Sequence, residues 1–381
     1  DAPEAAAFYA LAHLAVAPAD TLTLTHSERA ANLLLPVYQK NPDHPGAMHY
    51  LVHANDATGR EHEAPAIVRK YEATAPRNPH ALHMPTHIYT RLGEWDAVIR
   101  GNLRAAEAAL EHPAGERGEF IWDEFPHAIE YLVYAYLQKG DDDRAAAQLR
   151  RLHETPRLEP SFKTAFHLAS TQARFALERR DWSAAARLAA REPSALAWDR
   201  FPWPEAVIWF AKGLGAARQR NPGDAHSAAE RLNRLEQNAA ATGEDLFARN
   251  IRILRFAVNS WVAQLESDTA VSARLMREAA DLELATPKHA VTPAPTLPAH
   301  ELLGDLYLVQ SRATDALAAF QKSLELYPRR FNSLLGAARA ARASGNAVVA
   351  RTYYQQLLDV AGGGTRAELA EARAALNSSQ D

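Results

Sequence analysis

The stretch that decides the fold lies at residues 300–328 and reads HELLGDLYLVQSRATDALAAFQKSLELYP. Small residues such as Gly304 allow two helices to cross closely, and large ones such as Phe320 fill the remaining gaps. The next unit, FNSLLGAARAARASGNAVVARTYYQQLL at residues 331–358, repeats the pattern, because Tyr354 takes the place of Phe320 (354 − 320 = 34). We therefore expect helical hairpins that repeat along the chain.

The rest of the chain continues this pattern. Alanine-rich amphipathic segments recur throughout, no segment alternates with the period of a strand, and Gly and Pro fall mostly between the segments. The 34-residue interval between Phe320 and Tyr354 is the period of the tetratricopeptide repeat (TPR). Its signature is matched by Leu303, Gly304, Tyr307, Ala316, Phe320 and Pro328. We predict an all-α solenoid of TPR-type hairpins forming a right-handed superhelix, with about nine hairpins and a short final helix near 365–376.

Three interruptions suggest how the chain is organised. We expect residues 1–284 to form an N-terminal TPR-like array, and residues 298–376 to form a C-terminal TPR pair with a capping helix. The Pro-rich stretch 285–297 would join them as a stiff connector. The stretches 112–125 and 192–204 are rich in aromatic residues and read as packing loops, although the first could also cover a site and exclude water from it.

The composition limits the possible functions. The chain has 381 residues, 47% of them hydrophobic, so it can bury a large core. The net charge of −4 provides no electrostatic footprint for nucleic acid, and no apolar run is long enough for a membrane span. The absence of cysteine excludes disulfides and thiolate ligands. The chain begins at Asp1 rather than Met, which suggests a processed or trimmed product.

Two histidine pairs point to a metal site. His49 and His53 are four residues apart, as are His83 and His87, and the pairs are offset by one repeat (83 − 49 = 87 − 53 = 34). Each pair lies on one face of its helix, at equivalent places on consecutive hairpins. Pro85, inside the second pair, should bend its helix or free a backbone carbonyl.

From His44 onward, the words HPGAMHYLVHAND and PHALHMPTHIYTRLGEWD resemble a bacterial TPR family with these His-rich signatures. The resemblance covers most of the chain. It implies export, to the periplasm or elsewhere, rather than a cytoplasmic location. The repeat signature is specific for the fold but says little about function, since such folds serve many unrelated tasks.

The resemblance also implies which residues face the concave groove. In TPR hairpins these are positions 2, 5, 9 and 12 of the first helix. With Gly93, Gly140 and Trp182 setting the register, the groove-facing residues are His49, His53, Asp56, His80, His83, His87, His127, Glu130, Tyr134, His167, Ser170 and Arg174.

We predict the site residues from this set. The expected metal ligands are His49, His53, His83, His87 and His127, and the expected ligand-binding residues are Asp56, His80, His167 and Arg174. Nitrogen and oxygen donors suit a transition metal such as Cu, Zn or Fe, and argue against Cu(I). Asp56, Glu130 or His127 could complete the coordination, orient a ligand or support a second ion.

Three functions remain open. The leading hypothesis is a TPR protein that binds a transition metal through histidines on its concave face, together with a peptide, protein or small-molecule ligand. The second is a metal-dependent oxidoreductase or hydrolase in which Glu130 or Tyr134 transfers a proton. The third is a metal-free scaffold for protein interactions.

Overall fold

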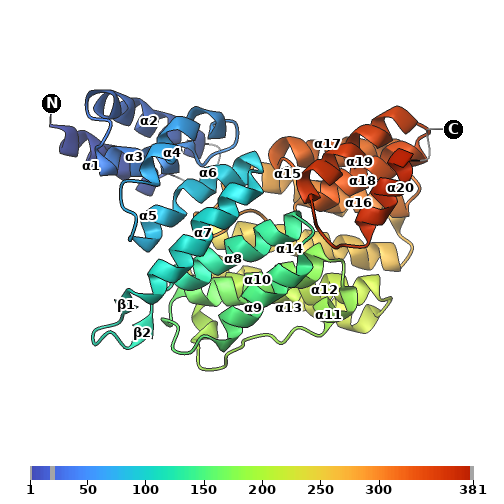
Figure 1. Ribbon diagram of the computed structural model, residues 1–381. Helices are drawn as coiled ribbons and strands as arrows, with labels where there is room; N and C mark the ends of the chain where they lie inside the picture. Colours follow the sequence, from blue (N-terminus) through green and yellow to red (C-terminus); the bar gives the residue numbers. More distant parts are fainter. Residues whose placement is uncertain (1, 18–21, 378–381) are drawn as a thin grey trace. The chain divides into compact units, whose positions relative to one another are not determined.

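The computed structural model describes residues 2–17 and 22–377, which are mostly helical (Figure 1). The chain divides into two compact units. The first comprises the chain up to Leu132 together with Pro156–Glu159 and Ala285–Pro293, and the second comprises the remaining described residues. The domain boundary that we expected at 285–297 stays a prediction.

The first unit consists of helical hairpins. Its helices are α1 (Pro3–Ala15), α2 (Leu22–Lys40), α3 (Pro45–Asn55), α4 (Pro65–Tyr71), α5 (Pro79–His83), α6 (Pro85–Leu92), α7 (Trp95–Leu110) and the first turns of α8 (Glu124–Gln138). A short 3₁₀ helix, η1 (Glu61–Glu63), precedes α4. Helix α1 packs on α2, α3 on α4, and α5 and α6 on α7.

The second unit continues the same pattern. It contains the end of α8, then α9 (Asp142–Glu154), α10 (Phe162–Glu178), α11 (Trp182–Ala186), η2 (Trp198–Arg200), α12 (Pro202–Arg218), α13 (Pro222–Ala241), α14 (Asp245–Leu265), α15 (Thr269–Leu284), α16 (Ala299–Val309), α17 (Ala313–Leu326), α18 (Phe331–Ala343), α19 (Ala347–Ala361) and α20 (Glu368–Asn377). In residues 2–17 and 22–377 the 20 α-helices follow one another in an order that corresponds to nine hairpins and one final helix, with α5 and α6 counted as one interrupted helix, which confirms the all-α, TPR-type class.

A single aromatic ring explains why two glycines occupy the C-terminal hairpins. The ring of Phe320 on α17 lies against Gly304 on α16 and Gly336 on α18. A Cβ atom added at Gly304 would come within 2.7 Å of this ring, and one at Gly336 would come closer still. The large residue therefore fits only because both facing positions lack a side chain.

The hairpin turns reverse the chain through a left-handed residue. Helix α6 ends at Leu92 and is capped by Gly93, whose φ is 67°, a conformation that glycine adopts without steric cost. The turn between α16 and α17 places Ser311 in the same region, with a φ of 59°. The turn geometry is thus retained even where the residue is unfavourable for it.

The insertion at 112–125 contains the short β structure that the sequence pattern did not predict. Strands β1 (Pro113–Ala114) and β2 (Phe120–Ile121) pair antiparallel, with Pro113 opposite Ile121. The last residues of the insertion begin helix α8. The insertion therefore leads directly into the helix that carries His127.

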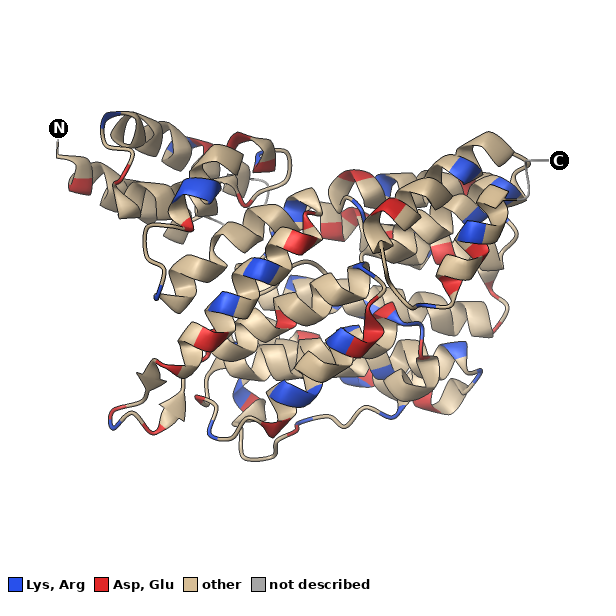
Figure 2. Cartoon of the chain, viewed as in Figure 1, with Lys and Arg blue, Asp and Glu red and all other residues tan. Residues whose placement is uncertain are grey.

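In the described ranges, no helix is both long enough and apolar enough to cross a membrane. Figure 2 shows basic and acidic residues interspersed along the helices of both units. This distribution agrees with the small net charge of −4.

Candidate metal centre

Local capping fixes the helix that carries the first histidine pair. His44 precedes α3, and its Nδ1 atom accepts a hydrogen bond from the backbone N–H of Ala47 at 3.3 Å. Pro45 occupies the first turn, where a missing N–H costs nothing. From this start, His49 and His53 lie one turn apart, with their Nε2 atoms 3.2 Å from each other.

The helix that carries the second pair is interrupted at Pro85. Helix α5 ends at His83 and α6 begins at Pro85, while Met84 between them keeps helical angles (φ −51°, ψ −43°). The hydroxyl of Thr86 donates to the carbonyl oxygen of His83 at 2.6 Å. The helix is thus interrupted next to Pro85, and although His83 precedes the interruption and His87 follows it, their Nε2 atoms still lie 2.9 Å apart.

The histidines form two groups of three. The half-buried triad consists of His49, His53 and His80, and the buried triad of His83, His87 and His127. Within each triad the potential ligand atoms lie within 4.8 Å of one another. His80, expected to bind a ligand, thus lies with His49 and His53, whereas the other three expected metal ligands form a group of their own.

The buried triad is almost completely inaccessible to solvent. The exposed fraction is 1% for His83, 3% for His87 and 3% for His127. The Nε2 atoms of His83 and His87 are 2.9 Å apart, and the ring centroids of His83 and His127 are 4.2 Å apart. Three imidazoles therefore converge on one small buried volume.

Hydrogen bonds to residues outside the triad determine which nitrogen of His83 and of His87 carries a proton. His83 Nδ1 lies 2.7 Å from Asn102 Oδ1, and the Asn102 amide is oriented because its Nδ2 donates to the backbone carbonyl of Val98. His87 Nδ1 lies 2.8 Å from the carboxylate of Asp56. Both partners are acceptors, so both Nδ1 atoms must donate. Metal-binding histidines in proteins commonly show this arrangement.

Because Nδ1 carries the proton in both rings, the Nε2 atoms of His83 and His87 present lone pairs to each other. Protonation of one ring would relieve the repulsion, but burial lowers the pKa of His87 and lowers the pKa of His83 well below its usual range. A metal ion would satisfy both lone pairs without a proton. The buried triad is therefore chemically suited to hold a cation.

Asp56 connects the buried triad to two basic residues. Burial alone would raise the pKa of Asp56, but Lys288 and Arg91 hold it well below its usual range. Arg91 Nε donates to Asp56 Oδ1 at 2.5 Å, and Lys288 Nζ lies 2.8 Å from Oδ2. Asp56 is therefore ionised, and it faces Nδ1 of His87 rather than the space between the three rings.

The half-buried triad has similar outer partners but is more accessible. His80 Nδ1 lies 3.1 Å from the carboxylate of Glu124, and the His80 side chain is 36% exposed. His49 Nδ1 lies 3.1 Å from the hydroxyl of Tyr71, whose pKa is raised by burial to about 12, so the hydroxyl keeps its proton. Burial and the neighbouring His80 lower the pKa of His49 to about 4.

The other predicted residues lie in different surroundings. Glu130 is fully buried on α8 in the first unit, whereas Tyr134, His167 and Arg174 belong to the second unit, and all four roles stay predictions. The Tyr134 hydroxyl accepts a hydrogen bond from buried Arg330 at 2.7 Å. Arg174 donates to the backbone carbonyls of Ala294, Pro295 and Thr296.

Sequence reasoning missed the partners that orient the rings. Tyr71, Asn102 and Glu124 contact the rings directly, whereas Arg91 and Lys288 hold Asp56. One signal was available for Glu124, because it precedes His127 by three residues and such residues share a helix face. Lys288 carried no local signal, since it lies in the Pro-rich stretch 285–297, far along the chain from Asp56.

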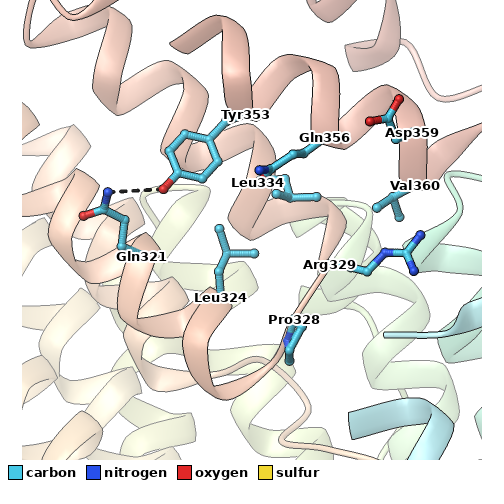
Figure 3. Close-up of a pocket in the computed structure, with 9 residues that line it drawn as sticks. All are labelled: Gln321, Leu324, Pro328, Arg329, Leu334, Tyr353, Gln356, Asp359 and Val360. Atoms are coloured by element: carbon cyan, nitrogen blue, oxygen red, sulfur yellow. Dashed lines mark hydrogen bonds between the residues drawn. The ribbon is translucent and has the colours of Figure 1, made fainter. Parts of the chain in front are cut away.

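A separate groove lies in the second unit between α17, α18 and α19 (Figure 3). It encloses about 570 Å³. Leu324, Leu334 and Val360 line it, and the Gln321 side-chain amide donates to the Tyr353 hydroxyl at its edge. Its lining residues include a single carboxylate, Asp359, and no histidine, so this groove does not share the chemistry of the triads.

The repeated hairpins define the chain as a helical-repeat protein of the TPR type. No family model matches it, so the resemblance to a family with His-rich signatures stays a prediction. A curated relative is cellulose synthase operon protein C of Xanthomonas axonopodis pv. citri (strain 306), 29% identical over 185 residues. That match covers 46% of this chain but only 12% of the relative.

Several solved structures are similar at low identity. Yeast Tom70 is 11% identical, with 98% of this chain and 88% of that chain covered and a TM-score of 0.41. A human IFIT1 dimer with m7Gppp-AAAA is 15% identical, with coverages of 95% and 73% and a TM-score of 0.43. A tetratricopeptide repeat protein from Parabacteroides merdae is 10% identical, with coverages of 98% and 97% and a TM-score of 0.31. Similarities at these sequence identities and TM-scores support no conclusion about function.

Proposed function

We propose that this TPR-type protein binds a transition metal ion through the buried triad of His83, His87 and His127. The observation that supports the proposal is the 2.9 Å approach of two Nε2 lone pairs whose rings already donate through Nδ1. Such an arrangement is costly when empty and favourable around a cation.

The donor set narrows the choice of metal. Three imidazole nitrogens suit Zn(II), Cu(II) or Fe(II), and the outer acceptors Asp56 and Asn102 would increase the basicity of two of them. Burial would exclude water from most of the coordination sphere. Asp56 would act as the residue that orients His87, which is one of the roles that the sequence left open for it.

Metal content measured by elemental analysis tests the proposal. The wild type and the variants His83→Gln and His87→Gln would be stripped with chelator, reloaded with Zn(II), and analysed after removal of excess metal. His62→Gln is the matched control, because the His62 side chain is 77% exposed in the same unit. Circular dichroism would verify that each variant is folded.

We expect His83→Gln and His87→Gln to bind less metal than the wild type, and His62→Gln to retain the wild-type content. Equal metal content in all four proteins would reject the proposal. Because the readout is metal content, the result does not depend on knowing a substrate or partner.

A metal-dependent enzyme is the second candidate function. This candidate is favoured by the exposure of His80 in the half-buried triad. An ion bound beside His80 would be partly exposed and could keep an open coordination position for water or substrate. X-ray absorption of the loaded protein would count the ligands. A coordination shell closed entirely by protein nitrogens would argue against this candidate, and a bound water or other oxygen ligand would support it.

A further inference from the structure

We infer that the half-buried triad of His49, His53 and His80 is a second metal position, and that its ion exchanges with solvent faster than the ion in the buried triad. The metal centre would then be dinuclear, with one labile and one retained ion. This inference rests on the proposed function and adds to it the number of ions and their accessibility.

The half-buried triad has ligand geometry of its own. The Nε2 atoms of His49 and His53 lie 3.2 Å apart, and the rings of His49 and His80 have centroids 5.0 Å apart. The carboxylate of Glu124 accepts from His80 Nδ1, which leaves Nε2 of His80 as its lone-pair nitrogen. The three rings can therefore offer three nitrogens without borrowing a ligand from the buried triad.

The two triads are neighbours. The rings of His53 and His87, one from each triad, have centroids 6.3 Å apart. Two cations in neighbouring triads would repel each other, and a nearby negative charge would offset that repulsion. Glu124 is 5% exposed, contacts His80, and begins the helix that carries His127 one turn later. Asp56 lies beside His87, but its charge is already paired with Arg91 and Lys288, so Glu124 is the carboxylate that would offset the second ion.

The accessibility of the triads differs in the direction that the inference requires. The His80 side chain is 36% exposed, whereas the exposed fraction of each residue of the buried triad is 3% or less. A chelator must reach a metal ion to remove it, so the half-buried position should release its ion first. The buried position should release its ion only when the surrounding helices open.

The experiment follows metal release into a chromophoric chelator. Wild-type protein, His80→Gln, His83→Gln and the control His62→Gln would each be loaded with Zn(II), freed of excess metal and mixed with 4-(2-pyridylazo)resorcinol. His80→Gln is the informative variant, because its partly exposed side chain is tolerant of substitution. Absorbance then reports both the number of ions and the rate at which each leaves.

We expect the wild type and His62→Gln to release two equivalents in separate fast and slow phases, and His80→Gln to lose the fast equivalent alone. A wild type that releases one equivalent, or a His80→Gln variant that keeps both phases, would overturn the inference. If the wild type releases one equivalent and His83→Gln releases none, the further inference fails but the proposed function still stands. Release of no metal from the wild type would overturn both.

Discussion

The Nε2 atoms of His83 and His87 lie 2.9 Å apart inside the protein, while the Nδ1 atoms of the same rings donate to Asn102 and Asp56. Neither ring can flip over without placing a lone pair against an acceptor. The facing lone pairs are therefore imposed by residues outside the triad, and those residues should influence metal affinity.

Replacing Asp56 by Asn should weaken metal binding by about 10–100-fold, because His87 loses the carboxylate that orients it and increases its basicity. The same change leaves Arg91 and Lys288 without their buried counterion, so the metal-free protein should also lose about 3–5 kcal/mol of unfolding free energy. Zn(II) titration measures the first effect, and denaturant unfolding of chelator-treated protein measures the second.

Asp43→Asn is the control, since Asp43 pairs with Lys70 at 3.0 Å but its side chain is 85% exposed. Both readouts should match the wild type within about 0.5 kcal/mol. An Asp56→Asn protein with unchanged Zn(II) affinity would show that the carboxylate does not support the metal centre.

Adding a methyl group at Gly336 should destabilise the C-terminal hairpins. The new Cβ atom would overlap the ring of Phe320, which costs about 1–3 kcal/mol when a packed core cannot relax. In Phe320→Leu the ring is absent, so the double variant should lose less than the sum of the two single losses. Urea unfolding of the four proteins in this cycle measures the coupling.

Gly223→Ala provides the contrast within the same unit. Gly223 lies in the first turn of α13, where an added Cβ would meet only Asn221 Oδ1 at 3.7 Å. This substitution should be neutral or stabilise by up to about 1 kcal/mol, because alanine is the better helix former. Equal losses for Gly223→Ala and Gly336→Ala would contradict a specific role for Phe320.

Replacing Ser311 by Gly should stabilise the protein by about 0.5–1 kcal/mol. Ser311 has a φ of 59°, where a side chain costs about 1–2 kcal/mol, and the gain is partly offset by the greater entropy of glycine in the unfolded chain. The reciprocal change, Gly345→Ser at the next hairpin turn with a φ of 79°, should destabilise. The idea fails if Ser311→Gly lowers the urea midpoint.

Glu283 should make stability fall as pH rises. Burial raises the pKa of Glu283 from its ordinary value of 4.5 to about 8. Between pH 4.5 and about pH 8 the folded protein holds a proton on Glu283 that the unfolded chain has released, so the free energy of unfolding falls as the pH rises. Above about pH 8 both states have lost this proton, and Glu283 no longer changes the stability.

Glu283→Gln should remove this dependence, because a neutral amide can still accept the hydrogen bond from the N–H of Ala299. The variant should gain on the order of 3–5 kcal/mol at pH 8.5 and little at pH 4.5. Glu278→Gln, whose carboxylate is 40% exposed and pairs with Arg274, should retain the wild-type pH profile. Parallel profiles for Glu283→Gln and wild type would refute the assignment.

Much of the fold was predictable because repeat hairpins depend on local periodicity. Phe320 and Tyr354 hold equivalent places in successive repeats, and the hairpins and final helix occur where the repeat period places them. The strands of the 112–125 insertion were not predictable in this way, because two-residue strands are too short to show alternation.

The candidate site was predictable only in part. The spacing of His49 with His53, and of His83 with His87, placed each pair on one helix face, and the Nε2 atoms within each pair do approach each other. The sequence did not indicate that His80 would lie with the first pair and His127 with the second. That grouping depends on how neighbouring helices rotate and cross, which residue spacing does not specify.

The sequence by itself determined the helices, their pairing into hairpins and the presence of histidines at equivalent places on consecutive repeats, because these follow from the helical period and the hairpin repeat. Tertiary structure alone decided which nitrogen of His83 and of His87 is available. The contacts of ionised Asp56 with His87, and of Lys288 with Asp56, join segments that are distant in sequence and form only once the chain has folded back on itself. Hydrogen-bond direction at an imidazole depends on those contacts, and no local pattern encodes them.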